Sequence, residues 1–264
     1  MEETEIQAAA EFLARSRIGG PPTPSPPPHL TPENEREGYA IQDALHSVLA
    51  GAGGGRLSGH KIGCTTAVMQ EFLSIDHPCA GCVFETTVFK GAVELPLSRF
   101  HRIGVECEIA ARLGADMLGA RGPYTRESVT DAVTACMGAI ELVDDRYENY
   151  SALAAPVLIA DDFFNAGVVL GDENQQWRAL DLANVCGVLK IDGTERASGL
   201  GSDILGHPME ALAWLANHRA GIGRPLRSGD FVLLGSVVQT VFFDAPAHVA
   251  IELEGLSCAE VRFT

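Results

Sequence analysis

The sequence has few basic residues, few aromatic residues and no long apolar run. Its 264 residues include 19 Lys and Arg against 35 Asp and Glu, a formal net charge of −16. Such a chain lacks the basic face that binds nucleic acid phosphates or anionic lipid surfaces, so neither is expected as a partner. No segment approaches the roughly 20 apolar residues of a membrane span, and the N-terminus is acidic where a secretory signal is basic.

Cysteine is also sparse, with seven residues at irregular spacing. An odd number without a regular pattern does not predict the disulfide framework of a small secreted domain. Cys107, Cys136 and Cys186 lie in apolar runs, where reduced and buried thiols are typical. We therefore expect a cytoplasmic protein.

The N-terminal quarter of the chain has the pattern of a helical arm. Residues 4–16 carry apolar residues at helical spacing, and the Pro-rich residues 18–30 predict an extended connector. A second helix is expected to begin with Thr31 as its N-cap and Pro32 at its first position, and to end at the glycines that follow Ala50. We predict a helical arm over residues 1–55.

The rest of the chain, residues 56–264, is dominated by strand patterns and is predicted to form one large domain. Residues 187–199 predict a hairpin around Asp192-Gly193, whereas residues 125–136 and 207–223 predict helices. Strands outnumber helices and do not alternate regularly with them, so we predict an α+β fold around a mixed β core. The predicted strands are residues 57–63, 87–95, 105–113, 139–145, 230–238, 248–255 and 259–263.

Two glutamates in one predicted strand are the first candidate site residues. In Val-Glu-Cys-Glu-Ile, Glu106 and Glu108 share one face of the strand, while Val105, Cys107 and Ile109 enter the core. On a helix the two carboxylates would point nearly apart. A solvated strand face would also account for this motif by itself.

A third glutamate makes a metal site the better interpretation. Glu141 lies between Ile140 and Leu142 in an apolar strand, where a bare carboxylate is expensive to bury. Three carboxylates without nearby Cys or His suit a hard ion that prefers oxygen ligands. We predict that Glu106, Glu108 and Glu141 bind one Mg²⁺ or Mn²⁺ ion.

Lys61 stands in the glycine-flanked segment Gly-His-Lys-Ile-Gly-Cys-Thr-Thr. This segment resembles the lysine segment of the 2-oxopent-4-enoate hydratase and 4-oxalocrotonate decarboxylase group in the fumarylacetoacetate hydrolase superfamily. The segments that resemble this group follow in family order: Gly59–Thr66, Gly104–Ala110, Ile140–Asp144, Ala160–Gly167, Gly206–Pro208, Ala213–Asn217, Gly255–Ser257 and Val261–Phe263.

The resemblance implies a β-roll or sandwich core with flanking helices, a divalent metal and a homo-oligomer. It also implies a small substrate, a 2-hydroxydienoate or 2-oxo acid of the kind formed when aromatic compounds are degraded by meta-cleavage. The metal would chelate the carboxylate and 2-oxo oxygen and stabilise an enolate, with Lys61 as the catalytic group that steadies charge or moves a proton. Thr66, Asp162 and Ser236 are expected to contact the substrate.

The exact reaction stays open at this point. A hydratase is the first interpretation, and a 4-oxalocrotonate-type decarboxylase, a C–C bond hydrolase of a diketo acid and a non-catalytic partner subunit are the alternatives. After His77-Pro78 the chain has Cys79-Ala80 where the group has an acidic or large residue followed by Tyr. Residues 145–150, in contrast, look more like the decarboxylases.

Two further motifs are set aside. Cys79-Ala80-Gly81-Cys82 lacks the second cysteine pair of a structural zinc site and the helix of a redox site, so we expect a flexible loop over the active site. The glycines of residues 199–206 do not have dinucleotide-loop spacing and follow a predicted hairpin, so we expect a turn near the substrate instead of an NAD site.

Overall fold

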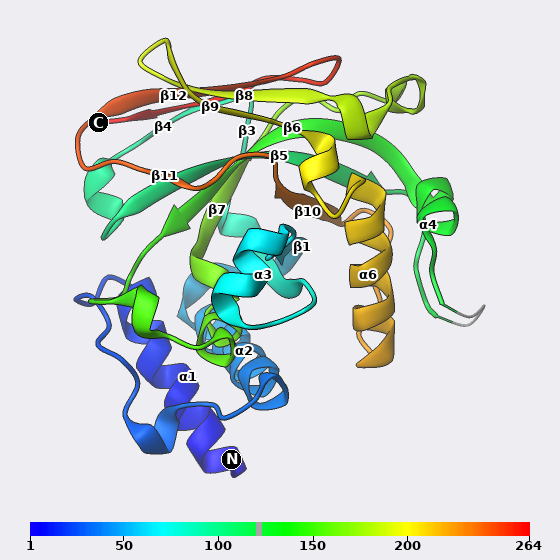
Figure 1. The fold of residues 1–264 in the computed structure, drawn as a ribbon. Helices are drawn as coiled ribbons and strands as arrows, with labels where there is room; N and C mark the ends of the chain where they lie inside the picture. The colour runs from blue at the N-terminus through cyan, green and yellow to red at the C-terminus, as the bar shows by residue number, and fades with distance from the viewer. Residues whose placement is uncertain (120–122) are drawn as a thin grey trace.

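The computed structural model describes residues 1–119 and 123–264 and contains two mixed β-sheets with helices around them. Figure 1 shows the smaller sheet lying above the larger one, with α1 and α2 at the opposite end and α6 along one side. This arrangement confirms the predicted α+β fold. None of the described helices is long and apolar enough to cross a membrane.

The larger sheet has eight strands and carries the middle of the molecule. Its path runs β2-β1-β10-β5-β6-β7-β3, with β11 paired to β5, and two of its pairs, β1 with β10 and β3 with β7, are parallel. The long central strands β5 and β6 pair antiparallel along almost their whole length. The strands are β1 Leu57–Gly63, β2 Cys79–Phe84, β3 Val88–Lys90, β5 Ile103–Leu113, β6 Val133–Asp144, β7 Asn165–Leu170, β10 Phe231–Ser236 and β11 Val241–Phe242.

The smaller sheet has five strands in the order β4-β13-β12-β8-β9. Its β8-β9 hairpin turns at Asp192 and Gly193, both with positive φ, which confirms the predicted two-residue turn. Apolar residues of the two sheets together form the main core. The strands are β4 Ala92–Leu95, β8 Cys186–Ile191, β9 Thr194–Leu200, β12 Ala247–Leu253 and β13 Ala259–Phe263.

The helices cover the open sides of the sheets, and the arm shares a second apolar core with them. Ala10 and Leu13 of α1 are buried in this core with Ile41 and Leu45 of α2 and Ile159 of α5. Whether residues 1–55 form a domain apart from residues 56–264 stays a prediction. The helices are α1 Glu3–Arg17, α2 Glu35–Leu49, α3 Ala67–Leu73, α4 Arg126–Ala132, α5 Ala155–Ala160 and α6 Pro208–Gly221.

The start of α2 and the strand predicted over residues 87–95 differ from the sequence prediction. The second helix begins at Glu35 with Asn34 as its N-cap, because the Thr31 hydroxyl instead donates to the carbonyl oxygens of Pro26 and Pro27. Residues 87–95 form two strands in different sheets. The chain turns between them at Gly91, whose φ is 67°.

Two further predictions were wrong because sheet pairing outweighs local pattern. The helix predicted over residues 125–136 ends at Ala132, since Val133 begins β6 and pairs with Leu113 of β5. Residues 79–82 are not a flexible loop. They belong to β2, whose six residues are all buried and pair with β1.

A candidate metal centre on strands β5 and β6

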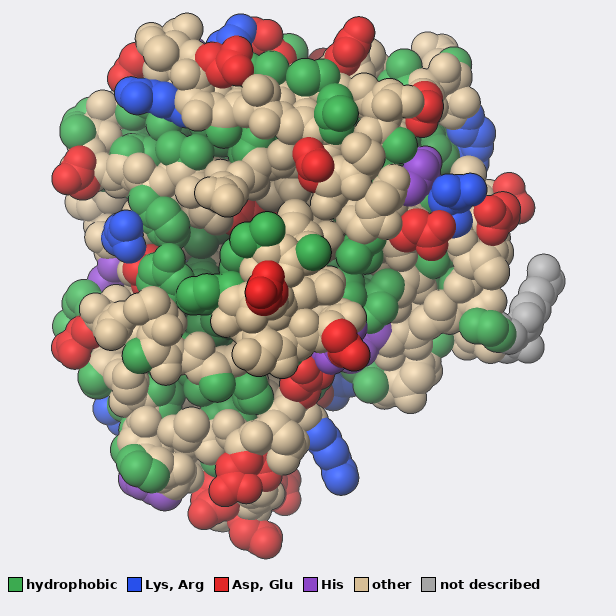
Figure 2. All heavy atoms as spheres, viewed as in Figure 1, with side chains coloured by type: hydrophobic (Ala, Val, Ile, Leu, Met, Phe, Trp, Pro, Cys, Tyr) green, Lys and Arg blue, Asp and Glu red, His purple; other side chains and the backbone are tan. Residues whose placement is uncertain are grey.

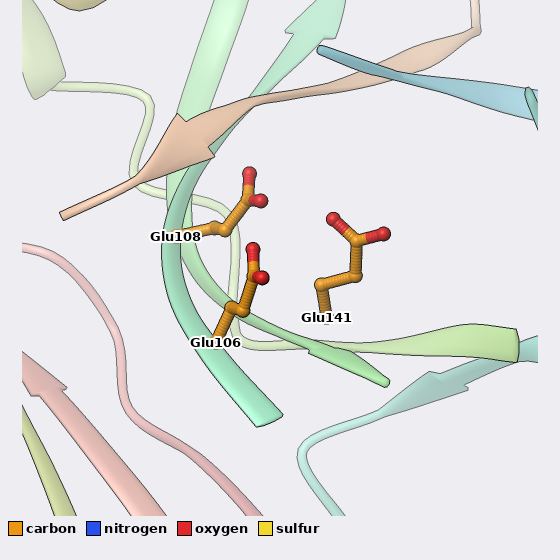
Figure 3. Close-up of side chains that lie close together, drawn as sticks. All are labelled: Glu106, Glu108 and Glu141. Atoms are coloured by element: carbon orange, nitrogen blue, oxygen red, sulfur yellow. The ribbon is translucent and has the colours of Figure 1, made fainter. Parts of the chain in front are cut away.

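The three predicted glutamates lie together on one face of the large sheet. Glu106 and Glu108 are two residues apart on β5, and Glu106 is paired in register with Glu141 on β6. Val105, Cys107 and Ile109 are fully buried on the other face, which confirms the predicted alternation. Figure 3 shows the three carboxylates turned toward a common space, and we call them the glutamate cluster.

Each glutamate has one oxygen held by a protein donor. The Thr240 hydroxyl donates to Glu106 Oε1. The backbone amide of Gly235 donates to Glu108 Oε2 at 3.0 Å. The side-chain amide of Asn165 donates to Glu141 Oε1 at 3.0 Å. Glu141 Oε2 is buried and has no hydrogen-bond partner among the described residues. Such tethers orient the carboxylates and leave the second oxygens facing one another.

The cluster is electrostatically unfavourable without a cation. Burial, together with the charge of Glu141, raises the pKa of Glu106 to about 7. Burial and the neighbouring carboxylates raise the pKa of Glu108 well above its usual range. Carboxylates this close repel one another when they are ionised, and a bound cation would relieve that repulsion.

The residues present fit a hard divalent ion. One ligand atom from each glutamate lies within 4.8 Å of the others, so small side-chain rotations would bring the three carboxylates to metal–oxygen distances near 2.1 Å around a shared centre. The donor set is oxygen only, and the unpartnered Glu141 Oε2 needs a donor or a cation. The geometry supports the predicted metal site, while metal binding itself stays a prediction.

Lys61 lies directly against the glutamate cluster. Its Nζ is 3.1 Å from Glu141 Oε1, and its side chain is only 5% exposed. Burial acts to lower the pKa of Lys61, but the charges of the three glutamates outweigh it, so that the net pKa is raised. The sequence offered no nearby acidic partner for this lysine, because that partner comes from a strand 80 residues further along the chain.

A glycine of the neighbouring strand makes room for the lysine side chain. Gly81 of β2 is paired in register with Lys61, and a Cβ there would lie 2.9 Å from Lys61 Cγ. Gly81 therefore has a clear role in the Cys-Ala-Gly-Cys motif, which the sequence alone did not explain.

The three residues predicted to contact substrate already have protein partners. Ser236 is paired in register with Glu108, and its hydroxyl donates to the Cys107 carbonyl oxygen at 3.2 Å. Thr66 caps α3 by accepting from the Met69 amide at 3.4 Å. Their contact with substrate stays a prediction.

Asp162, the third of these residues, is fully buried. Its carboxylate accepts from the Cys82 amide at 3.0 Å and forms ion pairs with His46 and Arg17. Burial acts to raise the pKa of Asp162, but His46 and Arg17 outweigh it and lower the pKa to about 2. The carboxylate thus supports its turn, and contact with substrate stays a prediction here too.

Sequence reasoning missed several residues that shape the site. Asn165 stood inside a segment that resembled the family, but nothing local indicated a bond to Glu141. Thr240 and Gly235 reach the glutamates only because β10 and β11 pair with β5. Residues 201–203 form a turn, and the Leu205 amide that follows donates to the Thr65 carbonyl oxygen at 3.1 Å. Its place near the substrate stays a prediction.

Acidic side chains gather at the end of the molecule where the N-terminus lies. Figure 2 shows acidic side chains gathered near the N-terminal end of the view and fewer basic ones, in keeping with the net charge of −16. The same figure shows acidic atoms at the bottom of a hollow near the middle of this face, close to where Figure 1 draws β7.

Comparisons with known proteins agree with this geometry. The family model for the C-terminal domain of fumarylacetoacetate hydrolase matches residues 71–264. A 2-keto-4-pentenoate hydratase of Burkholderia vietnamiensis is 32% identical over 226 residues, covering 86% of this chain and 85% of that protein. A 2-hydroxyhexa-2,4-dienoate hydratase of Comamonas testosteroni is 31% identical over 266 residues, covering 99% and 97%.

Solved structures show the same fold over the whole chain. A 4-oxalocrotonate decarboxylase from Pseudomonas putida G7, complexed with magnesium and adipate, superposes with a TM-score of 0.92 at 21% identity, covering 100% of this chain and 99% of that one. A fumarylpyruvate hydrolase from Pseudomonas aeruginosa, in complex with Mn²⁺ and pyruvate, gives a TM-score of 0.59 at 16% identity over 80% and 90%. With its family match, its hydratase relatives and its buried glutamate cluster, this chain belongs to the fumarylacetoacetate hydrolase family.

Proposed function

We propose that the chain is a hydratase, a lyase that uses a divalent metal to add water to a 2-hydroxydienoate or the related 2-oxo acid. The observation that carries the proposal is the glutamate cluster with a buried lysine against it. Relatives of 31% and 32% identity are hydratases of such dienoates, which supports this substrate class. The degradation of aromatic compounds by meta-cleavage produces substrates of this kind.

The chain's own residues would have two tasks, which are to bind the metal ion and to transfer a proton. Glu106, Glu108 and Glu141 would hold Mg²⁺ or Mn²⁺, which when bound supplies a Lewis acid toward the substrate carboxylate and 2-oxo oxygen. Hydration adds one proton and one hydroxyl group across the conjugated system. Lys61 Nζ, 3.1 Å from Glu141, lies against the glutamate cluster, and its ammonium is placed to donate that proton.

A decarboxylase of a 2-oxo diacid is the second candidate, because residues 145–150 resemble that group. A diacid substrate needs a cation for its second carboxylate, and Arg146 is the strongest cation of this segment. Its guanidinium is 3% exposed and is bonded to Asp161 at 2.9 Å. Since this arginine is already paired with Asp161 inside the protein, it is not free to bind a second substrate carboxylate.

The test is to supply both substrate classes to the purified protein with Mg²⁺. Loss of the ultraviolet absorbance of 2-hydroxypenta-2,4-dienoate without release of CO₂ is the expected result. Release of CO₂ from a 2-oxo diacid, with no turnover of the dienoate, would replace the hydratase proposal with the decarboxylase. Lys61→Ala protein and protein treated with EDTA serve as inactive controls.

We further propose that the chain is a cytoplasmic homo-oligomer. The seven cysteines are all free thiols, which is consistent with a reducing compartment. Val68, Met69 and Phe72 on α3 are exposed apolar residues that a second copy could cover. Light scattering at micromolar concentration should give a multiple of 28.0 kDa, and a value equal to that mass would contradict the oligomer.

A further inference from the structure

Arg17, the last residue of α1, contacts the turn that precedes β7. The Arg17 side chain is 8% exposed and forms ion pairs with Asp161 at 3.3 Å and Asp162 at 3.1 Å. The same guanidinium donates to the carbonyl oxygen of Asn165 at 2.6 Å. One side chain of the N-terminal arm therefore holds both ends of the turn formed by residues 162–164.

The backbone of this turn is strained, so contacts from other segments must stabilise it. Asp162, Phe163 and Phe164 have φ values of 51°, 48° and 66°, so three consecutive residues with side chains occupy the left-handed region. Such residues have a steric cost there and persist only where their surroundings impose the conformation. Packing supports one side of the turn, because Phe163 is buried in the apolar core shared by α1, α2 and α5, and the Arg17 contacts hold its polar ends.

The turn leads directly into a contact with the glutamate cluster. Asn165 is the first residue of β7, is 2% exposed and donates its amide to Glu141 Oε1. That bond occupies one oxygen of Glu141 and leaves the unpartnered Oε2 for a ligand. A change in the turn would move the Asn165 side chain and remove one of the two contacts that orient Glu141 Oε1, the other being Lys61 Nζ.

We propose that Arg17 is a positioning residue for the metal centre, acting through the 162–164 turn and Asn165 to set the orientation of Glu141. The inference rests on the proposed metal site. It assigns the N-terminal arm a part in metal affinity, in addition to its packing against α2. Outer contacts of this kind typically change metal affinity by about 10- to 100-fold when they are removed.

The test is calorimetric titration of Mn²⁺ into the full-length protein, which measures metal affinity without relying on turnover. Arg17→Met keeps an apolar stem of similar length, and Arg15→Met is the matched control. Arg15 lies in the same last turn of α1 but is exposed and stacks on Phe12. We expect Arg17→Met to weaken Mn²⁺ binding about 10-fold and Arg15→Met to leave it unchanged.

A double variant separates positioning from a general structural role. Because Arg17 acts through Asn165, Arg17→Met combined with Asn165→Ala should bind Mn²⁺ no more weakly than Asn165→Ala alone. Effects that multiply would show that the two residues act independently, and would overturn the inference. A dissociation constant of Arg17→Met within twofold of the wild type would overturn it as well.

A conservative variant covers the case in which Arg17→Met does not fold. Arg17→Lys keeps the charge beside Asp161 and Asp162, but an ammonium cannot span Asp162 and the Asn165 carbonyl at once. It should melt near the wild-type temperature and still bind Mn²⁺ several-fold more weakly, whereas wild-type affinity would overturn the inference.

Glu141→Gln separates this inference from the proposed function. If the wild type binds no Mn²⁺, or if Glu141→Gln binds it normally, the metal centre itself is wrong and the inference falls with it. If Glu141→Gln loses binding while Arg17→Met and Arg17→Lys keep it, only the role of Arg17 is overturned.

Discussion

Two groups of buried carboxylates lie within a few residues of one another in this protein, and they have opposite electrostatics. The glutamate cluster sets three carboxylates against one ammonium, that of Lys61. The second group, which we call the aspartate cluster, is Asp144, Asp161 and Asp162, and it is matched by cationic and imidazole partners. Those partners are Arg17, His46, His101 and Arg146.

The pKa shifts follow the difference in partners. Burial and mutual repulsion raise the pKa of Glu106 and Glu108, whereas His46 and Arg17 outweigh burial and lower the pKa of Asp162 to about 2. A buried cluster that lacks positive charge is suited to bind a cation, and one that is fully paired is suited to hold the fold. The comparison explains why two similar sets of residues are proposed to do different work.

The largest expected effect comes from removing the metal or one of its proposed ligands. EDTA should abolish activity, and added Mg²⁺ or Mn²⁺ should restore it. Glu108→Gln should lower kcat by more than about 10³-fold, since a positioned metal contributes several kcal/mol to catalysis. Without metal, Glu108→Gln should melt at no lower a temperature than the metal-free wild type, because the substitution removes one of three neighbouring carboxylates. Activity of Glu108→Gln near the wild-type level would contradict the assignment of the glutamate cluster.

The second largest effect is expected from substitution of Lys61, the one ammonium beside the glutamate cluster. Lys61→Ala should lower kcat by about 10²–10⁴-fold, the usual contribution of a positioned acid–base group. Lys61→Arg should restore little, because a guanidinium keeps its charge but does not give up a proton. Steady-state kinetics on the dienoate substrate, with thermal melting as the folding control, measures both. A loss of activity that tracks unfolding would return Lys61 to a structural role.

The aspartate cluster should respond most strongly in stability. Asp162→Asn leaves Arg17 and His46 without their buried carboxylate, so we expect the free energy of unfolding to fall by about 3 kcal/mol. Chemical denaturation measures the change. The matched variant is Glu85→Gln, which breaks the exposed ion pair with Arg56 and should cost less than about 1 kcal/mol. Equal losses for the two variants would remove the distinction between a buried network and a surface pair.

The smallest expected effect is the loss of folding free energy at acidic pH. The pKa of Asp162 is about 2 in the folded protein, below its ordinary value of 3.8, so its contribution is present above pH 4. That contribution is lost as the pH falls from about 4 toward 2, and it amounts to about 2 kcal/mol. Denaturation curves between pH 5 and pH 2 should show this loss in the wild type and a shallower loss in Asp162→Asn. Parallel curves would contradict the paired state of this carboxylate.

Much of the fold was predictable where local pattern and tertiary structure agree. Helix α1, strand β1, the Asp192-Gly193 hairpin and the alternation of Glu106 and Glu108 were all recognisable from residue spacing. The predictions failed where tertiary pairing decided the outcome. Val133 joined β6 instead of a helix, and the Cys79–Cys82 motif became a buried strand of the sheet.

The sequence by itself determined which residues could form the metal site, because two-residue periodicity in an apolar strand leaves only one face for Glu106 and Glu108. It also determined that Glu141 required a partner. Only the tertiary structure decided what surrounds them, since Lys61, Asn165 and Thr240 reach the glutamates through strand pairing and chain turns far apart in sequence. Local spacing carries information about a face of one strand, whereas a hydrogen bond between distant segments depends on how the whole chain packs.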